Sequence, residues 1–262
     1  MILKILSWNV NSVRTRLNQI LNICQKFKPN IICLQETKVI NDSFPKNEFR
    51  KLGYSYFYLN GLPSYNGVAI ITQKEAQSVN VLNLSNLNNG RQIGIKIFDT
   101  QIHNFYIPAG GDIPNELINP KFKNKLDFLK ILINWSKKIK PQNYIICGDF
   151  NIAPFEDDVW SHKQLKNVVS HTDIERKYLL KFLEAGNWND AVRHHINPPK
   201  NVFTWWSYRS RDFRVNNRGR RLDHIWVSND LHKKNYSTEI LSHTRVLDKP
   251  SDHVPIVIKI DL

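Results

Sequence analysis

The stretch Tyr144-Ile-Ile-Cys-Gly-Asp149-Phe-Asn151 is the most informative in this chain of 262 residues. Its apolar run leads to a glycine, after which a carboxylate and an amide follow two residues apart. A continuous apolar run is typical of a strand that is covered on both faces. Because side chains alternate along an extended chain, Asp149 and Asn151 are predicted to share one side at the exit of this strand. The alternative is an Asx-turn that merely closes the strand.

Two other apolar strands end in a similar way. The run Ile31–Gln35 leads to Glu36, and a lysine follows two residues later. In Ser7-Trp8-Asn9-Val10-Asn11, an amide stands at the exit of the first strand. Oxygen ligands at strand ends suit magnesium, which keeps several waters and takes few carboxylates. A surface Glu–Lys turn is the alternative for the segment that contains Glu36.

A histidine and an aspartate lie side by side near the C-terminus, in Ser251-Asp252-His253-Val254-Pro255. The side chains of two adjacent residues cannot readily hydrogen-bond each other, so His253 needs another carboxylate to orient its ring. Asp223, at the head of its own apolar strand, is the candidate. A carboxylate bonded to one ring nitrogen fixes the tautomer and leaves the other nitrogen facing a substrate. A lone histidine is more often structural, but five polar clusters at strand ends favour a site.

Strand-like segments outnumber helical ones, and the middle strands follow one another without an intervening helix. This order argues against a doubly wound sheet, in which strand and helix alternate strictly. Two packed sheets with helices outside fit better, in one domain over residues 1–262. The predicted strands cover 2–8, 31–35, 54–59, 68–72, 92–98, 102–107, 144–147, 222–227, 239–246 and 254–260. Helical spacing of apolar residues predicts helices over 17–27, 122–135 and 178–183.

The charge of the chain is strongly positive. Its 37 Lys+Arg against 23 Asp+Glu give a formal net charge of +14, and the pI is about 9.7. A field of this sign favours polyanions, so nucleic acid is the expected partner and an anionic membrane the main competitor. A general solubility charge is the plain alternative.

The three cysteines, Cys24, Cys33 and Cys147, stand among apolar neighbours and outside any CxxC pair. This spacing indicates buried thiols in a reducing compartment rather than disulfides or a zinc site. No apolar run approaches the roughly 18 residues of a membrane span. The sequence therefore predicts a cytoplasmic protein with no membrane partner.

Aromatic and basic residues mix in the segment that starts at Thr204-Trp205-Trp206-Ser207-Tyr208. Arginines pair with phosphates and aromatic rings stack on or fill gaps in a nucleic acid, so the segment is predicted to face DNA. A core tryptophan pair beside a solvated charged loop is the alternative. The candidate DNA-binding residues are Trp205, Arg209, Arg211 and Arg220, and the same segment carries Arg214, Arg218 and Arg221.

Six motifs, in order from Ile2 to Ile260, make the chain resemble the exonuclease III family of AP endonucleases. That family belongs to the endonuclease/exonuclease/phosphatase superfamily, with a deoxyribonuclease I-like fold. The motifs are Ser-Trp-Asn-Val-Asn, Gln-Glu-Thr-Lys, Tyr-Asn-Gly-Val-Ala, Gly-Asp-Phe-Asn, Arg-Leu-Asp and Ser-Asp-His-Val-Pro. Any one tetrapeptide is a weak signal, but six in family order over the whole chain are a strong one.

The resemblance implies an α/β fold: a four-layer sandwich of two mixed β-sheets packed face to face, with helices on both outer faces. It implies a Mg²⁺-dependent DNA phosphodiesterase of base-excision repair, with Mn²⁺ as a substitute. Such an enzyme would incise 5′ to abasic sites and trim 3′ ends of double-stranded DNA, acting as a monomer on abasic or 3′-blocked substrates. A superfamily phosphatase or phosphodiesterase acting on inositol phosphates, lipid phosphates or RNA is one alternative. A DNA-binding protein with a dead site is another.

The resemblance also assigns roles to individual residues. Asp149 would orient or deprotonate the attacking water, and Trp205 would help line the pocket for a flipped-out abasic sugar. Ala109 stands where human-type members of the family carry Asn, and Arg220 replaces an aromatic residue, which leaves the balance between abasic-site incision and exonuclease activity open. The implied catalytic residues are Tyr106, Asp149, Asn151, Asp223 and His253, and the implied metal-site residues are Asn9, Glu36, Asp149, Asn151 and Asp252.

Overall fold

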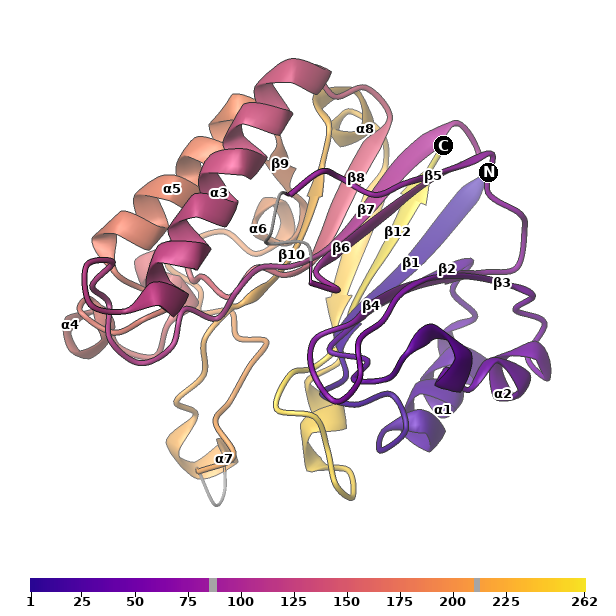
Figure 1. The fold of residues 1–262 in the computed structure, drawn as a ribbon, viewed down its shortest axis with the longest axis horizontal. Coiled ribbons are helices and arrows are strands. Elements are labelled where there is room, and N and C mark those ends of the chain that lie inside the picture. Colours follow the sequence, from indigo (N-terminus) through magenta and orange to yellow (C-terminus); the bar gives the residue numbers. More distant parts are fainter. Residues whose placement is uncertain (85–88, 210–212) are drawn as a thin grey trace.

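The computed structural model describes residues 1–84, 89–209 and 213–262. Within these residues the chain forms two six-stranded sheets that lie face to face (Figure 1). The first sheet contains β1 (Ile2–Asn9), β2 (Ile31–Gln35), β3 (Tyr56–Asn60), β4 (Val68–Thr72), β11 (Tyr236–Ile240) and β12 (Ile256–Asp261), in the order β11-β12-β1-β2-β4-β3. The second contains β5 (Ser78–Asn80), β6 (Gln92–Ile97), β7 (Thr100–Tyr106), β8 (Tyr144–Asp149), β9 (Asn189–Asp190) and β10 (Asp223–Val227), in the order β5-β6-β7-β8-β10-β9.

Both sheets are mixed. In the first, β1 runs parallel to β2 and antiparallel to β12. In the second, β7 runs parallel to β8, while β8 and β10 are antiparallel. Parallel neighbours bring their carboxyl ends to the same edge, so Asn9 lies beside Gln35 and Tyr106 beside Asp149.

Helices cover the outer face of each sheet. The longer ones are α1 (Leu17–Phe27) on the first sheet, and α3 (Pro120–Ile139) and α5 (Asp173–Ala185) side by side on the second (Figure 1). The shorter helices are α2 (Lys46–Arg50), α4 (His162–Leu165), α6 (Ala191–His195), α7 (Phe213–Asn216) and α8 (Asn229–His232), with 3₁₀ turns η1 (Asn41–Ser43), η3 (Glu156–Asp158) and η4 (Ser242–Val246). The predicted four-layer α/β sandwich is therefore confirmed.

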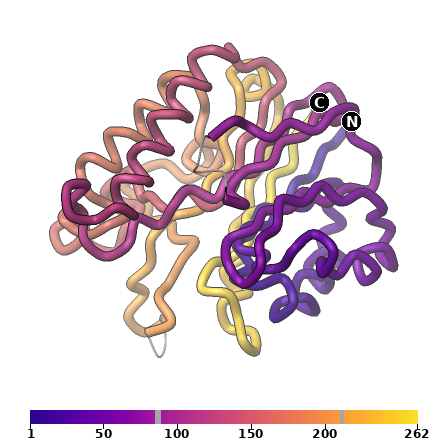
Figure 2. Tube along the Cα trace, in the orientation of Figure 1, coloured from indigo at the N-terminus to yellow at the C-terminus, as the bar shows by residue number. Residues whose placement is uncertain are grey.

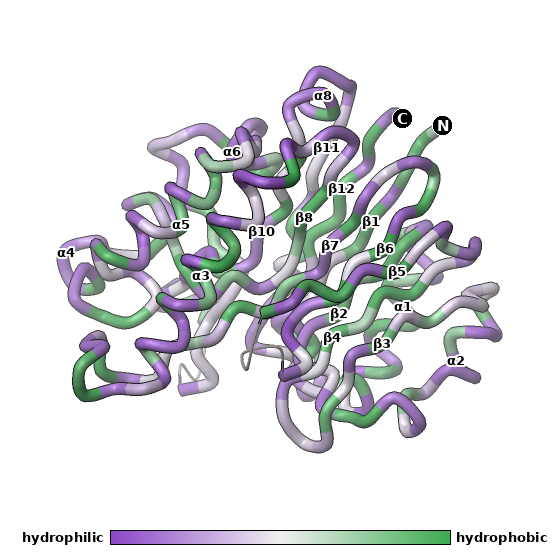
Figure 3. The backbone as a smooth tube through the Cα atoms, turned by 45° about the horizontal axis from the view of Figure 1, so that its top comes forward, coloured by the Kyte–Doolittle hydropathy of each residue, from purple (hydrophilic) through white to green (hydrophobic). Residues whose placement is uncertain are grey.

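The continuous apolar strands follow from this layering. In β8, Ile145 and Cys147 join the core between the two sheets. Ile146, which alternates with them, packs instead with Phe128 of α3 and Phe182 of α5. Hydrophobic residues accordingly recur along the strands of both sheets, whereas the turn around α8 is hydrophilic (Figure 3).

The chain begins and ends on neighbouring strands. The two termini lie side by side (Figure 2), and the Leu262 amide donates to the Met1 carbonyl at 2.9 Å. In the described part of the chain, no helix combines the length and apolar character needed to cross a membrane.

The predicted strand over 239–246 is wrong. Strand β11 begins earlier, at Tyr236, and ends at Ile240, and residues 242–246 form η4. The Thr244 hydroxyl donates to the Leu241 carbonyl at 2.8 Å. A local side-chain bond of this kind competes with strand pairing, and it turns the chain away from the sheet.

The predicted helix over 178–183 begins earlier than expected, at Asp173. Thr172 and Glu175 form a capping box at this end, because each side chain accepts a hydrogen bond from the other's backbone amide. That arrangement satisfies two amides that otherwise lack partners in the first helical turn. The apolar spacing on which the prediction relied does not extend into that turn.

Candidate active site

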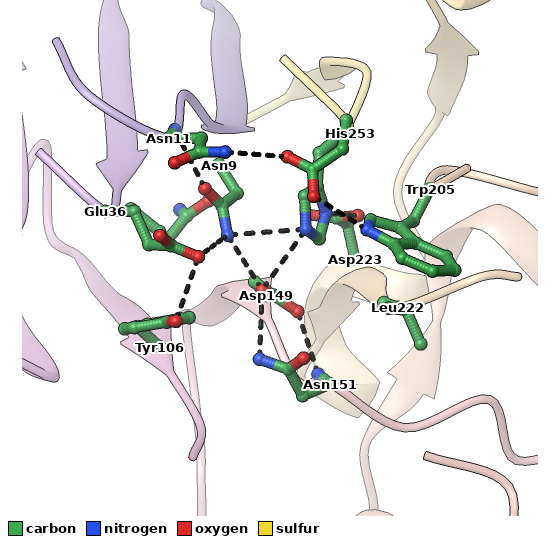
Figure 4. A network of polar contacts seen from close by, with 12 residues as sticks. Asn9, Asn11, Glu36, Tyr106, Asp149, Asn151, Trp205, Leu222, Asp223 and His253 are labelled. Carbon is green, nitrogen blue, oxygen red and sulfur yellow. Dashed lines mark hydrogen bonds and ion pairs between the residues drawn. The ribbon is translucent and has the colours of Figure 1, made fainter. Parts of the chain in front are cut away.

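Polar side chains from both sheets converge where β1, β2, β7, β8 and β10 begin or end (Figure 4). They come from six separate segments of the sequence, and most are buried. The residues that the structure brings together are Asn9, Glu36, Tyr106, Asp149, Asn151, Asp223, Asp252 and His253.

Gly148 allows β8 to approach β7 closely enough to place Asp149 in this centre. Its backbone has φ of +134°, and a Cβ atom built there would lie 1.9 Å from the carbonyl oxygen of Phe105 in β7. Only glycine fits such an approach without displacing backbone. The two strands can therefore place Tyr106 and Asp149 side by side.

Asn151 holds the Asp149 carboxylate by two hydrogen bonds. Its backbone amide donates to Oδ1 at 2.8 Å, which is the bond of an Asx-turn, and its side-chain amide donates to Oδ2 at 3.0 Å. The left-handed backbone of Asn151, with φ of +54°, permits both. The two interpretations of this motif are thus compatible, because the turn that closes the strand also orients the carboxylate.

Asn9 joins the acids of the two sheets. Its Nδ2 donates to Glu36 Oε1 and to Asp149 Oδ2, both at 2.9 Å. The Tyr106 hydroxyl also donates to Glu36 Oε1, at 2.9 Å. Lys38 Nζ lies 2.9 Å from Glu36 Oε2. The Glu–Lys turn that the sequence offered as an alternative is present, but both of its charged side chains are part of the polar centre.

The two acids differ in proton affinity. Burial opposes ionisation of Glu36, but the hydrogen bond from Asn9 and the charge of Lys38 outweigh it and lower the pKa of Glu36. Burial raises the pKa of Asp149 to about 7, with Asp223 and Glu36 adding to the rise and His253 and Asn9 opposing it. Burial, with the charges of Glu36 and Asp149, also raises the pKa of Tyr106, so its hydroxyl remains a donor.

His253 pairs with Asp223, as the sequence predicts. The ring Nδ1 lies 2.8 Å from Asp223 Oδ2, and Nε2 lies 3.7 Å from Asp149 Oδ2. Burial would lower the pKa of His253, but the carboxylates of Asp223 and Asp149 outweigh it and raise the pKa to about 10. The imidazole is therefore a cation at neutral pH, with one nitrogen held and the other facing the centre.

Thr204 is a member of the centre that the sequence did not single out. Its hydroxyl donates to Asp223 Oδ2 at 2.6 Å and accepts from the backbone amides of Leu222 and Asp223. Thr204 precedes Trp205 by one residue, and its distance from Asp223 in sequence gives no signal of this contact.

Asp252 faces away from the acids toward Trp205. Its Oδ2 accepts from the Trp205 indole nitrogen at 2.9 Å, and its Oδ1 accepts from Asn11 Nδ2 at 3.2 Å. Burial would raise the pKa of Asp252, but the charge of His253 and the bond from Trp205 lower it. Asp252 thus links the acidic centre to the aromatic segment.

Two overlapping sets of donors could hold a metal ion. Among the described residues, ligand atoms of Asp149, Asp223 and His253 lie within 4.8 Å of one another. However, Asp223 and His253 already engage each other through Nδ1. Glu36 and Asp149 form the second set and share the Asn9 amide. A cation beside Asp149 would stabilise its carboxylate against the burial that raises its pKa, and carboxylate and amide oxygens suit a hard cation.

The predicted DNA-binding residues have different environments. Trp205 is half-buried, and the Arg220 guanidinium lies 5.3 Å from its ring centroid. Arg220 Nη1 donates to Ser170 Oγ at 2.7 Å and to the Val169 carbonyl at 3.1 Å. Arg209 is exposed. Arg211 lies outside the described residues.

Two residues of the same segment belong to the interior. Trp206 is only 4% exposed. Arg221 is fully buried and forms ion pairs with Asp158 at 2.7 Å and Asp190 at 2.6 Å. The expectation that this segment as a whole faces DNA is therefore wrong for both residues. The acids that neutralise Arg221 come from distant parts of the chain.

A cavity of about 320 Å³ adjoins the centre on the side of Tyr106. Its lining includes Tyr65, Arg91, Ala109 and Lys121. The Arg91 guanidinium lies 4.9 Å from the Tyr106 ring centroid. Arg91 stands before an apolar strand, and nothing in the sequence distinguishes it from the other arginines.

Residues 6–253 match the family described as "Endonuclease/Exonuclease/phosphatase family". The chain is 31% identical to exodeoxyribonuclease III of Haemophilus influenzae, over 97% of this chain and 98% of that protein. Among solved structures it resembles an AP endonuclease from Archaeoglobus fulgidus, with a TM-score of 0.92, 34% identity and coverage of 99% of this chain and 100% of that chain. It also resembles the 3′ phosphatase NExo from Neisseria bound to a product DNA hairpin, with a TM-score of 0.91, 30% identity and coverage of 99% and 100%.

Proposed function

Because the chain belongs to the endonuclease/exonuclease/phosphatase family, we propose that it is a metal-dependent DNA phosphodiesterase that incises 5′ to abasic sites and trims 3′ ends. Relatives described as exodeoxyribonuclease III, AP endonuclease and DNA-bound 3′ phosphatase support this activity. The observation that carries it is one buried centre in which a carboxylate of raised pKa, Asp149, faces a histidine cation, His253.

Asp149 acts on the nucleophile. It removes a proton from a water that attacks phosphorus in line with the departing 3′ oxygen, and a pKa near the working pH suits such a base. The P–O3′ bond breaks, the oxygen of the attacking water stays on the 5′ phosphate, and the 3′ oxygen takes up a proton from solvent water to become a hydroxyl. Asn151 keeps the carboxylate in place through its two hydrogen bonds.

His253 and Tyr106 act on the charge of the phosphate. Protonated His253, oriented by Asp223, donates from Nε2 to a phosphate oxygen. The Tyr106 hydroxyl, which is a donor in the structure, contacts the phosphate from the other side. Preorganised donors of this kind stabilise a transition state because they need no reorientation during the reaction.

A divalent cation held by the carboxylates of Glu36 and Asp149 would supply Lewis-acid stabilisation of the same charge. Asn9 would join them through its amide oxygen once its side chain, whose Nδ2 donates to both acids in the structure, is turned. We propose Mg²⁺, with Mn²⁺ as a substitute, because the donors are carboxylate and amide oxygens. Asp252 would support the metal site indirectly. Both of its carboxylate oxygens already accept hydrogen bonds, from Asn11 and Trp205, so it would hold these neighbours rather than bind the cation itself.

The substrate is double-stranded DNA that carries an abasic site or a blocked 3′ end. We further propose one catalytic domain that acts as a monomer, since every residue of the centre comes from a single chain. A cytoplasmic location accords with the buried, unpaired state of Cys24, Cys33 and Cys147. Light scattering on the purified protein at micromolar concentration tests the monomer.

One set of incubations tests the activity. The pure protein is mixed with abasic duplex, 3′-phosphorylated duplex, intact duplex and an inositol polyphosphate, each with Mg²⁺ or with excess chelator. We expect cleavage of the first two substrates, little release from the inositol phosphate, and loss of all cleavage in chelator while DNA binding persists. Full cleavage in chelator, or a preference for the inositol phosphate, would contradict the proposal.

A further inference from the structure

A lysine lies on the buried face of α3, where helical spacing otherwise places apolar residues. Lys125 follows Phe122 by three residues and precedes Leu126, and all three are buried. Its side chain is 0% exposed. A buried ammonium requires a partner for each of its three protons, and each one has a partner here.

The ammonium reaches the loops that leave two active-site strands. Lys125 Nζ donates to the Asn151 carbonyl at 2.8 Å, just past the end of β8. It donates to the Ala109 carbonyl at 3.1 Å, just past the end of β7. One side chain therefore fixes the spacing of the two loops that follow Tyr106 and Asp149.

The carboxylate of Glu175 accepts the third hydrogen bond of the ammonium. It is also 0% exposed, and it accepts hydrogen bonds from the Ser170 amide and from the Thr172 amide and hydroxyl. The Glu175 carboxylate is thus held by the residues that cap α5. Lys125 cannot follow a displaced Asn151 without breaking this pair, so the anchor is stiff.

The neighbouring backbone packs closely against this side chain. Gly110 has φ of +95°, and a Cβ atom there would lie 3.0 Å from Lys125 Cδ. Asn151 has a left-handed backbone, and its side chain both orients Asp149 and donates to the Ile107 carbonyl at 2.9 Å. An anchor on the Asn151 carbonyl holds that residue in its uncommon conformation.

We propose that Lys125 is a positioning residue of the phosphodiesterase, and that its ammonium fixes Asn151 and through it the Asp149 carboxylate. The inference rests on the proposed function and adds a residue that touches neither phosphate nor metal. A buried ion pair contributes little net stability compared with apolar residues of similar volume. The pair is therefore better explained by placement of the loops than by stability.

The test compares two substitutions with a control on the same helix. Lys125→Met keeps the length of the side chain but leaves the Glu175 carboxylate without its cation, so Lys125→Met/Glu175→Gln is made beside it to remove that buried charge. The control is Ser136→Ala, because Ser136 is also fully buried and accepts from the Trp188 indole nitrogen at 2.7 Å. It lies eleven residues further along α3, about 16 Å away at 1.5 Å per residue.

The measurements are the single-turnover cleavage rate at saturating abasic duplex, the DNA Kd in chelator, and the melting temperature. A small misplacement of a reacting group costs on the order of 100-fold. We expect both Lys125 variants to lose about 30- to 100-fold in rate, with Kd changed less than about threefold, and Ser136→Ala to keep its rate.

Two results would overturn the inference. One is a folded double variant that cleaves within about threefold of the wild type, and the other is a rate loss matched by Ser136→Ala at equal melting temperature. Failure of the proposed function is distinct, because the wild-type protein itself would then cut no DNA.

Discussion

Asn9 is the residue on which the two halves of the centre meet. It comes from the first sheet, and its amide bridges Glu36 of that sheet to Asp149 of the second at 2.9 Å each. Its own carbonyl accepts from the Ser251 hydroxyl, which in turn accepts from the His253 amide. The relative position of base and histidine therefore depends on the side chain and the backbone carbonyl of one residue, and not only on the strands that carry them.

The Asp223–His253 pair gives a graded series of substitutions. His253→Ala removes the cation and is expected to lower the cleavage rate by roughly 10³-fold or more. Asp223→Asn keeps the ring but weakens its orientation, and should fall between that variant and the wild type. Thr204→Val, which removes the donor to Asp223 Oδ2, should lose about tenfold. Single-turnover rates on abasic duplex provide the comparison, with thermal unfolding as the control. Near-wild-type turnover of His253→Ala would show that the pair is structural.

The pH dependence of cleavage follows from the two shifted groups. Asp149 must be unprotonated to act as a base, so at low metal concentration the rate should rise as pH passes through its pKa of about 7. His253 must be protonated to donate, so the rate should fall as pH passes through its pKa of about 10. More Mg²⁺ stabilises the Asp149 carboxylate and should move the acidic limb to lower pH. A rate that is flat across neutral pH at limiting metal would contradict these assignments.

At the scale of the element, the strand that ends at Asp149 could be predicted because its evidence is local. The apolar run, the glycine and the two polar residues are consecutive, and they form β8 and its turn. The roles of Lys38 and Thr204 could not be predicted in this way, since each depends on which strand lies beside it. The prediction that Arg221 faces DNA is wrong for the same reason, because the acids that pair with it come from distant parts of the chain.

Several short elements could not be predicted from the sequence, for physical reasons. Strands β5 and β9 contain three and two residues, too few for an alternation to be visible. In η4 a threonine hydroxyl bonds the backbone in place of a strand partner. What the sequence does specify is where the long strands lie, and their ends are where the site residues sit.

A glycine substitution tests the junction of β7 and β8. Gly148→Ala would drive a Cβ atom into the Phe105 carbonyl at 1.9 Å, so the free energy of unfolding should fall by more than about 3 kcal/mol. Gly53 is the matched control, because its φ is also positive at +88° but no atom lies within 4 Å of a built Cβ. Gly53→Ala should cost only about 1–2 kcal/mol. Chemical denaturation measures both, and equal losses would mean that the Phe105 contact is unimportant.

At the scale of the whole molecule, an acidic centre is carried by a basic protein. Glu36, Asp149, Asp223 and Asp252 would repel a phosphodiester, but the chain has a net charge of +14. A field of that sign attracts DNA from a distance, while the acids act only at contact. The segment that contains α7 extends beyond the sheets near the end that carries these acids (Figure 1). Trp205 of this segment donates a hydrogen bond to Asp252.

Attraction of DNA and recognition of its damage are expected to depend on different residues of the same segment. Each arginine that contacts a phosphate contributes about 0.9 to the slope of log affinity against log salt. Arg209→Ala should therefore weaken binding to abasic and intact duplex alike and flatten that slope, because Arg209 is exposed in the same segment as Trp205. Lys137→Ala removes an equal charge at the far end of α3 and should leave the slope unchanged.

Trp205→Ala should behave differently from both charge variants. The indole carries no charge, so the slope should stay, but the ring shapes the surface between Asp252 and Arg220. Preference for abasic over intact duplex should fall, with removal of 3′-terminal nucleotides less affected. Salt titrations of binding and paired incision and exonuclease rates measure these effects. If Arg209→Ala lost abasic cleavage selectively while Trp205→Ala changed the slope, attraction and recognition would be assigned to the wrong residues.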